Sequence, residues 1–287
     1  MKMLIVGATS SVAHTLIPLL ESMGEVTTAG RSGADVHLDL EQRAESIAIP
    51  AGTDVVINTA AHFGGNTQAD ILAAASTNAI GTLRLCQAAI EAGVGHIVQI
   101  SSMFADLQAD SPFFGPYSLS KRHADELAEL SCATGNLALT VLRPARLYGK
   151  GEGFRRHQPF LYRLLEQAQR GEEISIYGSN DARRWFLHIN DIAQIIALVV
   201  RHRIAGRYDC LPATPVSCSE IAALAFDAFG QPRRIRFLPD KPNIADDVIP
   251  AGRSAPGSDL YEKLQFQPGI SMQAGILDIA SSWTLPI

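Results

Sequence analysis

Short apolar runs alternate with helical patterns through the first half of the chain. The first run, MLIVGA at 3–8, precedes a helical pattern that stops at Gly24. The runs are rich in Val, Ile and Leu and show little alternation, which is typical of strands buried on both faces. This strand–helix–strand repetition predicts an α/β fold with a doubly wound parallel sheet. The expected strands lie at 3–8, 25–30, 34–40, 54–61, 96–102 and 137–145.

The pattern changes near residue 150. A polar loop, KGEGFRRHQPF, leads into a helical pattern, and 185–200 indicates a strand that turns into a helix. After residue 211 prolines and short elements dominate, so we expect a smaller, irregular C-terminal lobe. The expected boundaries are a first domain at 1–150, to which 185–210 returns, and a second lobe made of 151–184 and 211–287.

Composition excludes several classes of protein. The 287 residues carry a formal net charge of −5, whereas nucleic-acid-binding proteins usually present a basic face. The four cysteines lie far apart without a CxxC pair, which argues against a metal site or a disulfide framework and favours a reducing compartment. No leader-like segment opens the sequence, and the longest apolar run is far too short to span a bilayer. We therefore expect a cytoplasmic protein without membrane contacts.

The segment GATSSVA follows the first expected strand and opens a helical pattern. A dinucleotide-binding turn prefers three spaced glycines in this context, and here only Gly7 is kept, with Ser10 and Ala13 at the other two positions. Phosphates bound there would meet unpaired backbone N–H groups and the positive end of the helix dipole. An ordinary strand–helix turn of an α/β protein is the alternative.

Arg31 indicates which dinucleotide such a turn would hold. An NAD site usually carries Asp or Glu about 20 residues after the glycines, but 26–34 contains no acid. The guanidinium of Arg31 suits a 2′-phosphate, and Ser32 can add a donor, so NADP is expected, with NAD as the alternative. A solvated surface arginine would have the same sequence signature. Asp39 ends the next strand, where a carboxylate can meet the adenine amino group.

The segment YSLSK places Tyr117 and Lys121 four residues apart, on one face of an expected helix. A lysine ammonium beside a phenol favours the phenolate, so we expect the pKa of Tyr117 to be lowered from about 10. Such a tyrosine can exchange a proton with an alcohol or a ketone near neutral pH. The pair therefore predicts acid–base chemistry on a carbonyl or hydroxyl group.

Two serines end a buried strand fifteen residues before the tyrosine. Ligands of doubly wound sheets collect at the carboxyl ends of strands, so the hydroxyl of Ser102, or alternatively Ser101, can bind the reacting oxygen. Asn78 lies inside a helical pattern, where asparagine is unfavourable without a partner. It can link the lysine through water or brace the backbone.

Taken together, these motifs resemble the short-chain dehydrogenase/reductase superfamily, and in particular its extended branch of NAD(P)-dependent nucleotide-sugar epimerases, dehydratases and reductases. The likeness covers nearly the whole chain, and its motifs follow in the order of the family. They are GATSSVA, NTAA, NAIGT, ISSM, YSLSK, LRPARLYG and RWFLHINDIA. The resemblance implies a Rossmann domain with a substrate lobe.

The resemblance also implies roles for individual residues. Tyr117 would be the general acid/base, Lys121 its partner and ribose clamp, and Ser102 the hydroxyl that polarises the substrate, with Asn78 completing the catalytic set. Tyr117, Lys121 and a longer run of residues would bind the cofactor. That run is Gly7, Thr9, Ser10, Ser11, Val12, Arg31, Ser32, Asp39, Leu40, Asn58, Thr59, Ala60, Ala61 and Pro144.

On the substrate side, the resemblance implies binding by Ser101, Ser102, Arg146 and Arg184. Arg184 would meet a substrate diphosphate, for which bidentate hydrogen bonds give a physical reason. Its alternative role is an ion pair with a local acid such as Asp181. Further expectations are Arg253 as a second phosphate contact, His188 as a cap or brace of its strand, and Asp191 as a helix N-cap.

The chain departs from the family pattern at informative places. Two glycines of the turn are replaced, and MFAD follows the serines where 4,6-dehydratases carry an Asp-Glu pair, so dehydration is not expected. The expected function is hydride transfer at a ring carbon of a nucleotide-linked sugar, by reduction of a keto-sugar or by 4-epimerisation. The alternatives are reduction of a small non-sugar carbonyl and a non-catalytic NADP sensor. Apolar helices at 71–92 and 117–133 can form a homodimer.

Overall fold

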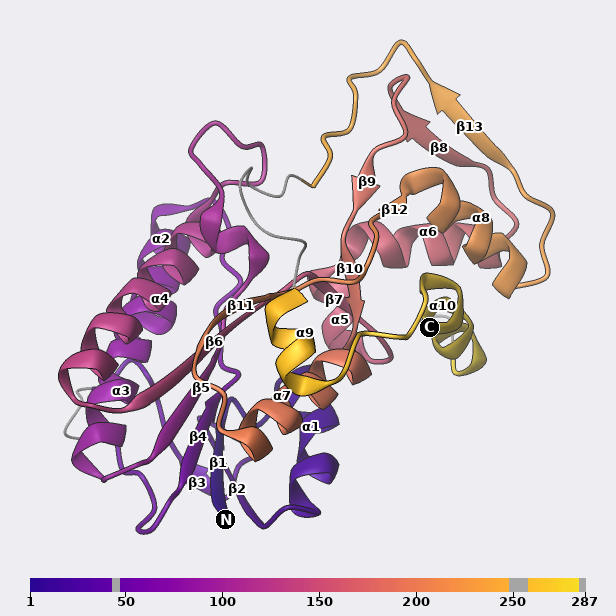
Figure 1. The fold of residues 1–287 in the computed structure, drawn as a ribbon. Coiled ribbons are helices and arrows are strands. Elements are labelled where there is room, and N and C mark those ends of the chain that lie inside the picture. The colour runs from indigo at the N-terminus through magenta and orange to yellow at the C-terminus, as the bar shows by residue number, and fades with distance from the viewer. Residues whose placement is uncertain (43–46, 248–257, 284–287) are drawn as a thin grey trace. The chain divides into compact units, whose positions relative to one another are not determined.

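The computed structural model describes residues 1–42, 47–247 and 258–283, which form two compact units (Figure 1). Unit 1 comprises Met1–Pro144, Ile192–Cys210 and Gly257–Phe266, and unit 2 comprises Ala145–Asp191, Leu211–Pro256 and Gln267–Ile287. The boundaries expected from the sequence, which assign 185–210 to the first domain, remain a prediction about domain organisation.

Unit 1 contains a seven-stranded sheet with the order β11-β6-β5-β4-β1-β2-β3. All neighbouring strands are parallel, and the order reverses between β1 and β4, where sheets of this kind bind ligands. The doubly wound parallel sheet expected from the sequence is confirmed. Its strands are β1 (Lys2–Val6), β2 (Glu25–Gly30), β3 (Val36–His37), β4 (Val55–Asn58), β5 (His96–Ile100), β6 (Ala138–Pro144) and β11 (Gly206–Cys210).

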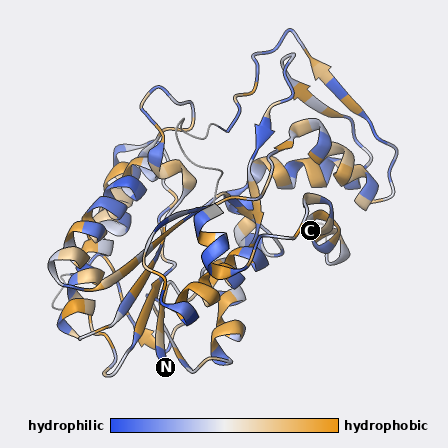
Figure 2. Cartoon of the chain, viewed as in Figure 1, coloured by the Kyte–Doolittle hydropathy of each residue, from blue (hydrophilic) through white to orange (hydrophobic). Residues whose placement is uncertain are grey.

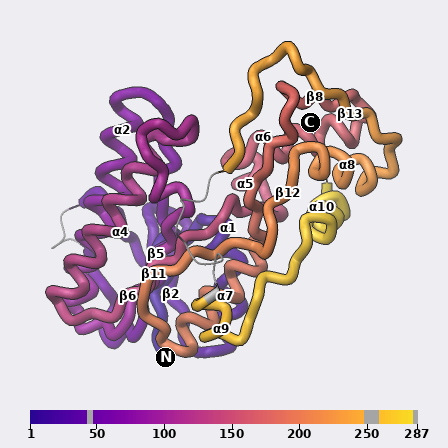
Figure 3. Tube along the Cα trace, turned by 45° about the horizontal axis from the view of Figure 1, so that its top comes forward, coloured from indigo at the N-terminus to yellow at the C-terminus, as the bar shows by residue number. Residues whose placement is uncertain are grey.

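Helices cover both faces of this sheet, as two views of unit 1 show (Figures 1 and 3). One face carries α2 (Gln68–Ala74), α3 (Gly81–Glu91) and α4 (Pro116–Thr134). The other carries α1 (Ser11–Glu21), α7 (Ile189–His202) and α9 (Ser258–Leu264). Because both faces are covered, the central strands are mostly apolar, as the hydropathy colouring shows (Figure 2).

The core of unit 1 lies between the sheet and helices α3 and α4. Every residue of β4 and β5 is buried, so the non-alternating apolar runs of the sequence have their physical explanation here. Side chains from β1, β4, β5 and both helices pack into one cluster. Its members include Leu4, Val6, Val56, Leu85, Cys86, Ala89, Ile97, Ala128 and Cys132.

A wider helical turn interrupts the helix before α3. The segment Ala75–Ile80 is a π-helix, η2, which joins α2 to α3 without a break. Such π turns insert extra residues and are frequent at functional sites. This turn carries Asn78, which is only 2% exposed. The asparagine expected inside a helix therefore lies where the helix itself is distorted.

Unit 2 is smaller and irregular, as expected. Its strands form three two-stranded pairs, β7 (Arg146–Tyr148) with β10 (Phe186–His188), β8 (Ile174–Tyr177) with β13 (Ile235–Leu238), and β9 (Arg183–Arg184) with β12 (Val216–Ser217). The helices are α5 (Glu152–His157), α6 (Pro159–Gln169), α8 (Cys218–Ala228) and α10 (Met272–Ser281). Within the described part of the chain, no helix has the length and apolarity needed to cross a membrane.

Candidate active site

The turn between β1 and α1 is built around Gly7. This residue has a φ of +93°, a conformation that side chains other than glycine rarely adopt. A Cβ at this position would lie 2.7 Å from the amide nitrogen of Ala60 and 2.8 Å from Oγ1 of Thr59. Any other residue would push the turn away from the end of β4, so the glycine that the sequence keeps is the one that the geometry requires.

Ser10 occupies the N-cap of α1. Its Oγ accepts a hydrogen bond of 3.0 Å from the amide of Ala13 and lies 2.8 Å from Oγ1 of Thr59. Ala13 is completely buried, so both replacements of glycine are absorbed and the strand–turn–helix geometry is intact. Because first-turn amides have no acceptor within the helix, those of Ser11 and Val12 fit an anionic diphosphate. The turn therefore fits a dinucleotide.

Arg31 and Ser32 follow β2, and both are exposed. Asp35, one residue beyond the acid-free segment 26–34, accepts hydrogen bonds of 2.8 Å from the amide and from Oγ1 of Thr28. These bonds lower the pKa of Asp35 and tie its carboxylate to the backbone of β2. The sequence did not indicate this contact, because Asp35 meets Thr28 only through the way the chain folds after β2.

The segment after β3 is anchored locally. The amide of Glu41 donates a hydrogen bond of 3.0 Å to Oδ1 of Asp39, and Leu40 is buried. Nη1 of Arg84 donates to the carbonyl of Leu40 at 3.3 Å and to that of Glu41 at 2.9 Å. The adenine contact of Asp39 stays a prediction. The carboxylate of Asp39 already accepts a hydrogen bond within its own turn.

The end of β4 is fixed by buried side chains. Asn58 donates a hydrogen bond of 2.9 Å to Gln99 and accepts one of 3.2 Å from the amide of Ala60. Oγ1 of Thr59 donates to the carbonyl of Val6 at 2.9 Å, which ties β4 to β1. These bonds fix the backbone along which the resemblance places the cofactor. The polar side-chain atoms of Asn58 and Thr59 are engaged in these bonds.

Tyr117 and Lys121 lie in the first turns of α4, next to the carboxyl end of β5. Lys121 is 2% exposed, and its Nζ donates a hydrogen bond of 2.8 Å to the carbonyl of Ile100. The same Nζ lies 5.9 Å from the centroid of the Tyr117 ring. The helix therefore brings the expected pair onto one face, with the lysine tied to the strand end.

The pKa values of this pair differ from the expectation. Burial raises the pKa of Tyr117 to about 12; a hydrogen bond with Ser102 lowers it, and the charge of Asp125 raises it. Burial also lowers the pKa of Lys121 to about 8, against the opposing effect of Asp125. The expected lowering of the Tyr117 pKa by Lys121 is therefore wrong for this structure, because the loss of water around both groups outweighs their proximity.

The two serines at the end of β5 have different partners. Oγ of Ser102 accepts a hydrogen bond of 3.2 Å from the amide of Phe104, and the Ser102 hydroxyl lowers the pKa of Tyr117. Oγ of Ser101 donates a hydrogen bond of 2.9 Å to Asp125 and is buried. The geometry thus favours Ser102 for contact with a reacting oxygen, and gives Ser101 a structural partner.

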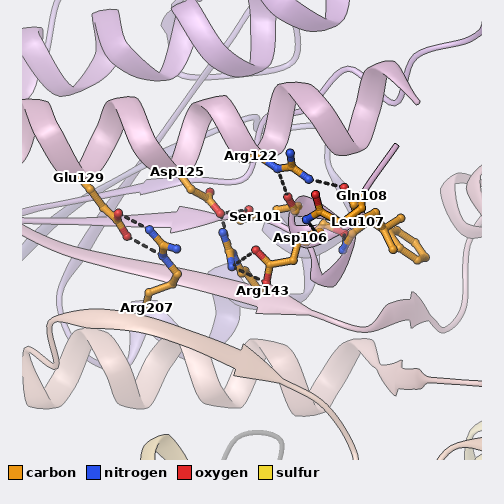
Figure 4. Close-up of polar contacts among 12 residues, drawn as sticks. Ser101, Asp106, Leu107, Gln108, Arg122, Asp125, Glu129, Arg143 and Arg207 are labelled. Atoms are coloured by element: carbon orange, nitrogen blue, oxygen red, sulfur yellow. Dashed lines mark hydrogen bonds and ion pairs between the residues drawn. The ribbon is translucent and has the colours of Figure 1, made fainter. Parts of the chain in front are cut away.

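A buried ionic network that the sequence did not indicate includes Ser101 (Figure 4). Arg143 on β6 donates from Nε to Asp125 at 2.7 Å and from Nη1 to both oxygens of Asp106 at 2.8 and 2.9 Å. Asp125 is completely buried and lies one helical turn after Lys121. Burial raises the pKa of Asp125, which Arg143 and Ser101 counteract. The network joins α4, β6 and the turn after Ser102.

Asn78 braces the backbone, one of its two expected roles. Its Nδ2 donates to the carbonyl of His62 at 2.8 Å and to Oγ of Ser120 at 2.9 Å. Its Oδ1 accepts a hydrogen bond of 2.7 Å from the amide of His62. Both ends of the amide thus hold the segment after β4 against α4, which positions Phe63 over the ring of Tyr117.

In unit 2 the two expected substrate arginines share one carboxylate. Arg146 donates to Asp247 from Nε at 2.8 Å and from Nη2 at 2.7 Å. Nη1 of Arg184 lies 3.7 Å from the same Asp247. Asp181, the acid expected beside Arg184, instead accepts hydrogen bonds from Ser219. The sequence did not predict Asp247 as their partner, because it lies some sixty residues or more from both arginines along the chain.

Two further expectations concern His188, at the end of β10, and Asp191, in the first turn of α7. Asp191 is not an N-cap: its carboxylate accepts the amides of Gly269 at 3.3 Å and Ile270 at 3.1 Å. His188 caps locally, since its Nδ1 accepts the amide of Asn190 at 3.2 Å. The N-cap expectation was wrong because the helix begins two residues earlier, at Ile189. Arg253 lies outside the described residues.

Comparison with known proteins places this geometry in a family. Residues 3–209 match the model of the NAD dependent epimerase/dehydratase family. The chain belongs to this family. The membership confirms the resemblance to the extended short-chain dehydrogenases/reductases and an enzyme that uses a nicotinamide dinucleotide.

A curated relative of this family member is the dTDP-4-dehydro-6-deoxy-D-allose reductase of a Streptomyces species. The two are 27% identical over 280 residues, which cover 91% of this chain and 81% of the relative. Among solved structures, UDP-N-acetylglucosamine 4-epimerase from Bacillus cereus has a TM-score of 0.75 at 20% identity, covering 98% and 96% of the two chains. UDP-glucose 4-epimerase of Thermus thermophilus in complex with NAD gives 0.71 at 17%, covering 98% of each. These structures support the fold.

Proposed function

We propose that this family member reduces the 4-keto group of a sugar linked to a nucleoside diphosphate. The observation that carries the proposal is the cluster of Ser102, Tyr117 and Lys121 at the carboxyl end of β5. A relative that spans nearly the whole chain is named as a reductase of a dTDP-linked 4-dehydro-6-deoxy sugar. The same residues suit 4-epimerisation; the name of this relative and the proposed use of NADPH favour net reduction.

The protonated form of Tyr117 suits the reductive direction. A phenol with a pKa of about 12 stays protonated at neutral pH and is ready to donate to an oxygen that gains negative charge. Ser102 donates a second hydrogen bond to that oxygen, and Lys121 adds positive charge beside it. When bound, the nicotinamide supplies the hydride. Oxidation of an alcohol, the first half of an epimerisation, would need Tyr117 to begin as a base.

Elimination of water has no support among these residues. Met103 and Phe104 stand where dehydratases carry their acid and base, according to the resemblance. Asp106, which follows on the same turn, has its carboxylate bound to the buried Arg143. A reaction that needs a second proton-transfer group on this turn is therefore disfavoured.

For the cofactor we propose NADPH. The exposed Arg31 and Ser32 supply donors suited to a 2′-phosphate, and the nearby Asp35 is held by Thr28. Gly7, Ser11 and Val12 would hold the diphosphate, with Lys121 on the nicotinamide ribose. NAD, which one solved family structure contains, is the alternative. In unit 2, Arg146 and Arg184 would bind the substrate diphosphate, their positions set by Asp247.

The test is consumption of NADPH with a dTDP-linked 4-keto-6-deoxyhexose. Stoichiometric oxidation of NADPH, with a dTDP-6-deoxyhexose as product, is the expected result. Conversion between two dTDP-hexoses without net NADPH consumption would show an epimerase. Turnover of a simple ketone alone would show a small-carbonyl reductase, and binding of NADPH without any turnover would show a sensor. Light scattering on the same sample tests the expected homodimer.

A further inference from the structure

Phe63 lies against the ring of Tyr117. The two ring centroids are 5.3 Å apart, and the planes differ by 13°, which is a stacked arrangement. Phe63 nevertheless remains 49% exposed, so the aromatic pair presents apolar surface to the solvent beside the acid–base phenol. A large apolar side chain in this position suggests a ligand surface.

The segment that carries Phe63 is rigidly held. The Asn78 side chain makes two hydrogen bonds to the backbone of His62: it accepts one from the amide at 2.7 Å and donates one to the carbonyl at 2.8 Å. Nδ1 of His62 accepts the amide of Gly64 at 3.0 Å, and Gly64 has a φ of +82° that favours glycine. Both neighbours of Phe63 are thus fixed, and the ring is presented on a backbone that has little freedom to move it away.

We infer that Phe63 forms the apolar wall of the sugar subsite and selects sugars that carry a methyl group, and not a hydroxymethyl group, on C5. The inference rests on the proposed reduction at C4. The oxygen on C4 must come within hydrogen-bonding distance of the Tyr117 hydroxyl, and C5 is bonded to C4. In the inferred pose C5, and not C3, lies on the Phe63 side of C4, so the substituent of C5 lies beside the stacked rings.

The chemistry of the ring explains the selection. A phenylalanine face gains by covering a methyl group and the C–H groups of a pyranose. It offers no acceptor to replace the water that a C6 hydroxyl loses, so a hydroxymethyl group there is penalised. The occupant that fits is a nucleoside diphosphate linked to a 6-deoxyhexose.

Titration calorimetry with dTDP-6-deoxyglucose, dTDP-glucose and dTDP tests this selection, because the two sugars differ only in the C6 hydroxyl. The wild-type chain is expected to bind the 6-deoxy sugar about tenfold more tightly than dTDP-glucose. Phe63→Ser should bring the two Kd values to within about threefold of each other, with the Kd of dTDP unchanged. Phe63→Tyr keeps the stacked ring and should keep the preference. Phe237→Ser, at an exposed phenylalanine of unit 2, is the matched control.

Equal Kd values for the two sugars in the wild type would overturn the inference, as would a preference that survives in Phe63→Ser. Both outcomes leave the proposed reduction intact, since the assay with the 4-keto sugar is independent of them. If neither sugar nucleotide binds more tightly than dTDP, and the 4-keto sugar is not reduced, the proposed function fails and the inference fails with it. Melting temperatures of the variants verify that each is folded.

Discussion

Lys121 donates its hydrogen bond to the carbonyl of Ile100, 2.8 Å away, while its Nζ lies 5.9 Å from the centre of the Tyr117 ring. The ammonium is thus tied to the end of β5, and one turn later Asp125 supplies the compensating negative charge. The acid–base pair consequently depends on a carboxylate that touches neither substrate nor cofactor in the proposed reaction.

The rate of reduction should fall as pH rises past about 8, where Lys121 loses its proton. Asp125 raises the pKa values of both Lys121 and Tyr117, so its removal lowers both. Asp125→Asn should therefore move the descending limb of the kcat/KM profile to lower pH. Glu129→Gln, which removes a partly exposed carboxylate of the same helix, serves as control and should leave the profile in place. An unshifted limb in Asp125→Asn would contradict this role.

Arg143 should be important for stability. It is 1% exposed and binds two carboxylates, so Arg143→Met leaves Asp125 buried without its cationic partner. Loss of one member of a buried ion pair typically costs about 3–5 kcal/mol. Arg207→Met removes the partly exposed partner of Glu129 and should cost no more than about 1 kcal/mol. Urea unfolding of both variants measures the difference, and equal losses would show that the network is not a stabilising element.

The cofactor preference depends on Arg31. Arg31→Ala removes a donor suited to the 2′-phosphate and should weaken NADPH binding by roughly tenfold or more, since charge-assisted bidentate bonds are among the stronger hydrogen bonds. The Kd of NADH should change little, because that cofactor lacks the phosphate. Fluorescence titration with the two cofactors provides the comparison, and an equal effect on both would remove the preference for NADPH.

His96 should make stability depend on pH. Burial lowers its pKa to about 4, and its Nε2 lies 2.7 Å from Oγ1 of Thr140. In the unfolded chain His96 has a pKa near 6.5 and binds the proton more readily than in the folded chain. The contribution of neutral His96 to stability is therefore complete above pH 6.5 and is lost as pH falls toward 4. Linkage gives a loss of about 3 kcal/mol over that range. His96→Gln should flatten the dependence in urea unfolding between these pH values; an unchanged slope would show that other groups cause it.

The sequence predicted the features that local patterns encode. Apolar runs without alternation identified the parallel strands, and the spacing of Tyr117 and Lys121 placed both on one face of α4. Partners distant in the chain carried no such signal. Arg143 meets Asp106 and Asp125, and Arg146 meets Asp247, only because the fold brings separate elements together. The direction of the Tyr117 pKa shift was mispredicted for a related reason, since burial of a phenol depends on the packing of the whole unit.

The most direct test of the account is the Tyr117→Phe variant, assayed with NADPH and a dTDP-linked 4-keto-6-deoxyhexose. The variant keeps the ring that stacks on Phe63 and loses only the hydroxyl that donates the proton. We predict that kcat falls by about 100- to 10,000-fold while the Kd of NADPH stays the same. A kcat within about threefold of the wild type would contradict the assignment of Tyr117 as the proton donor.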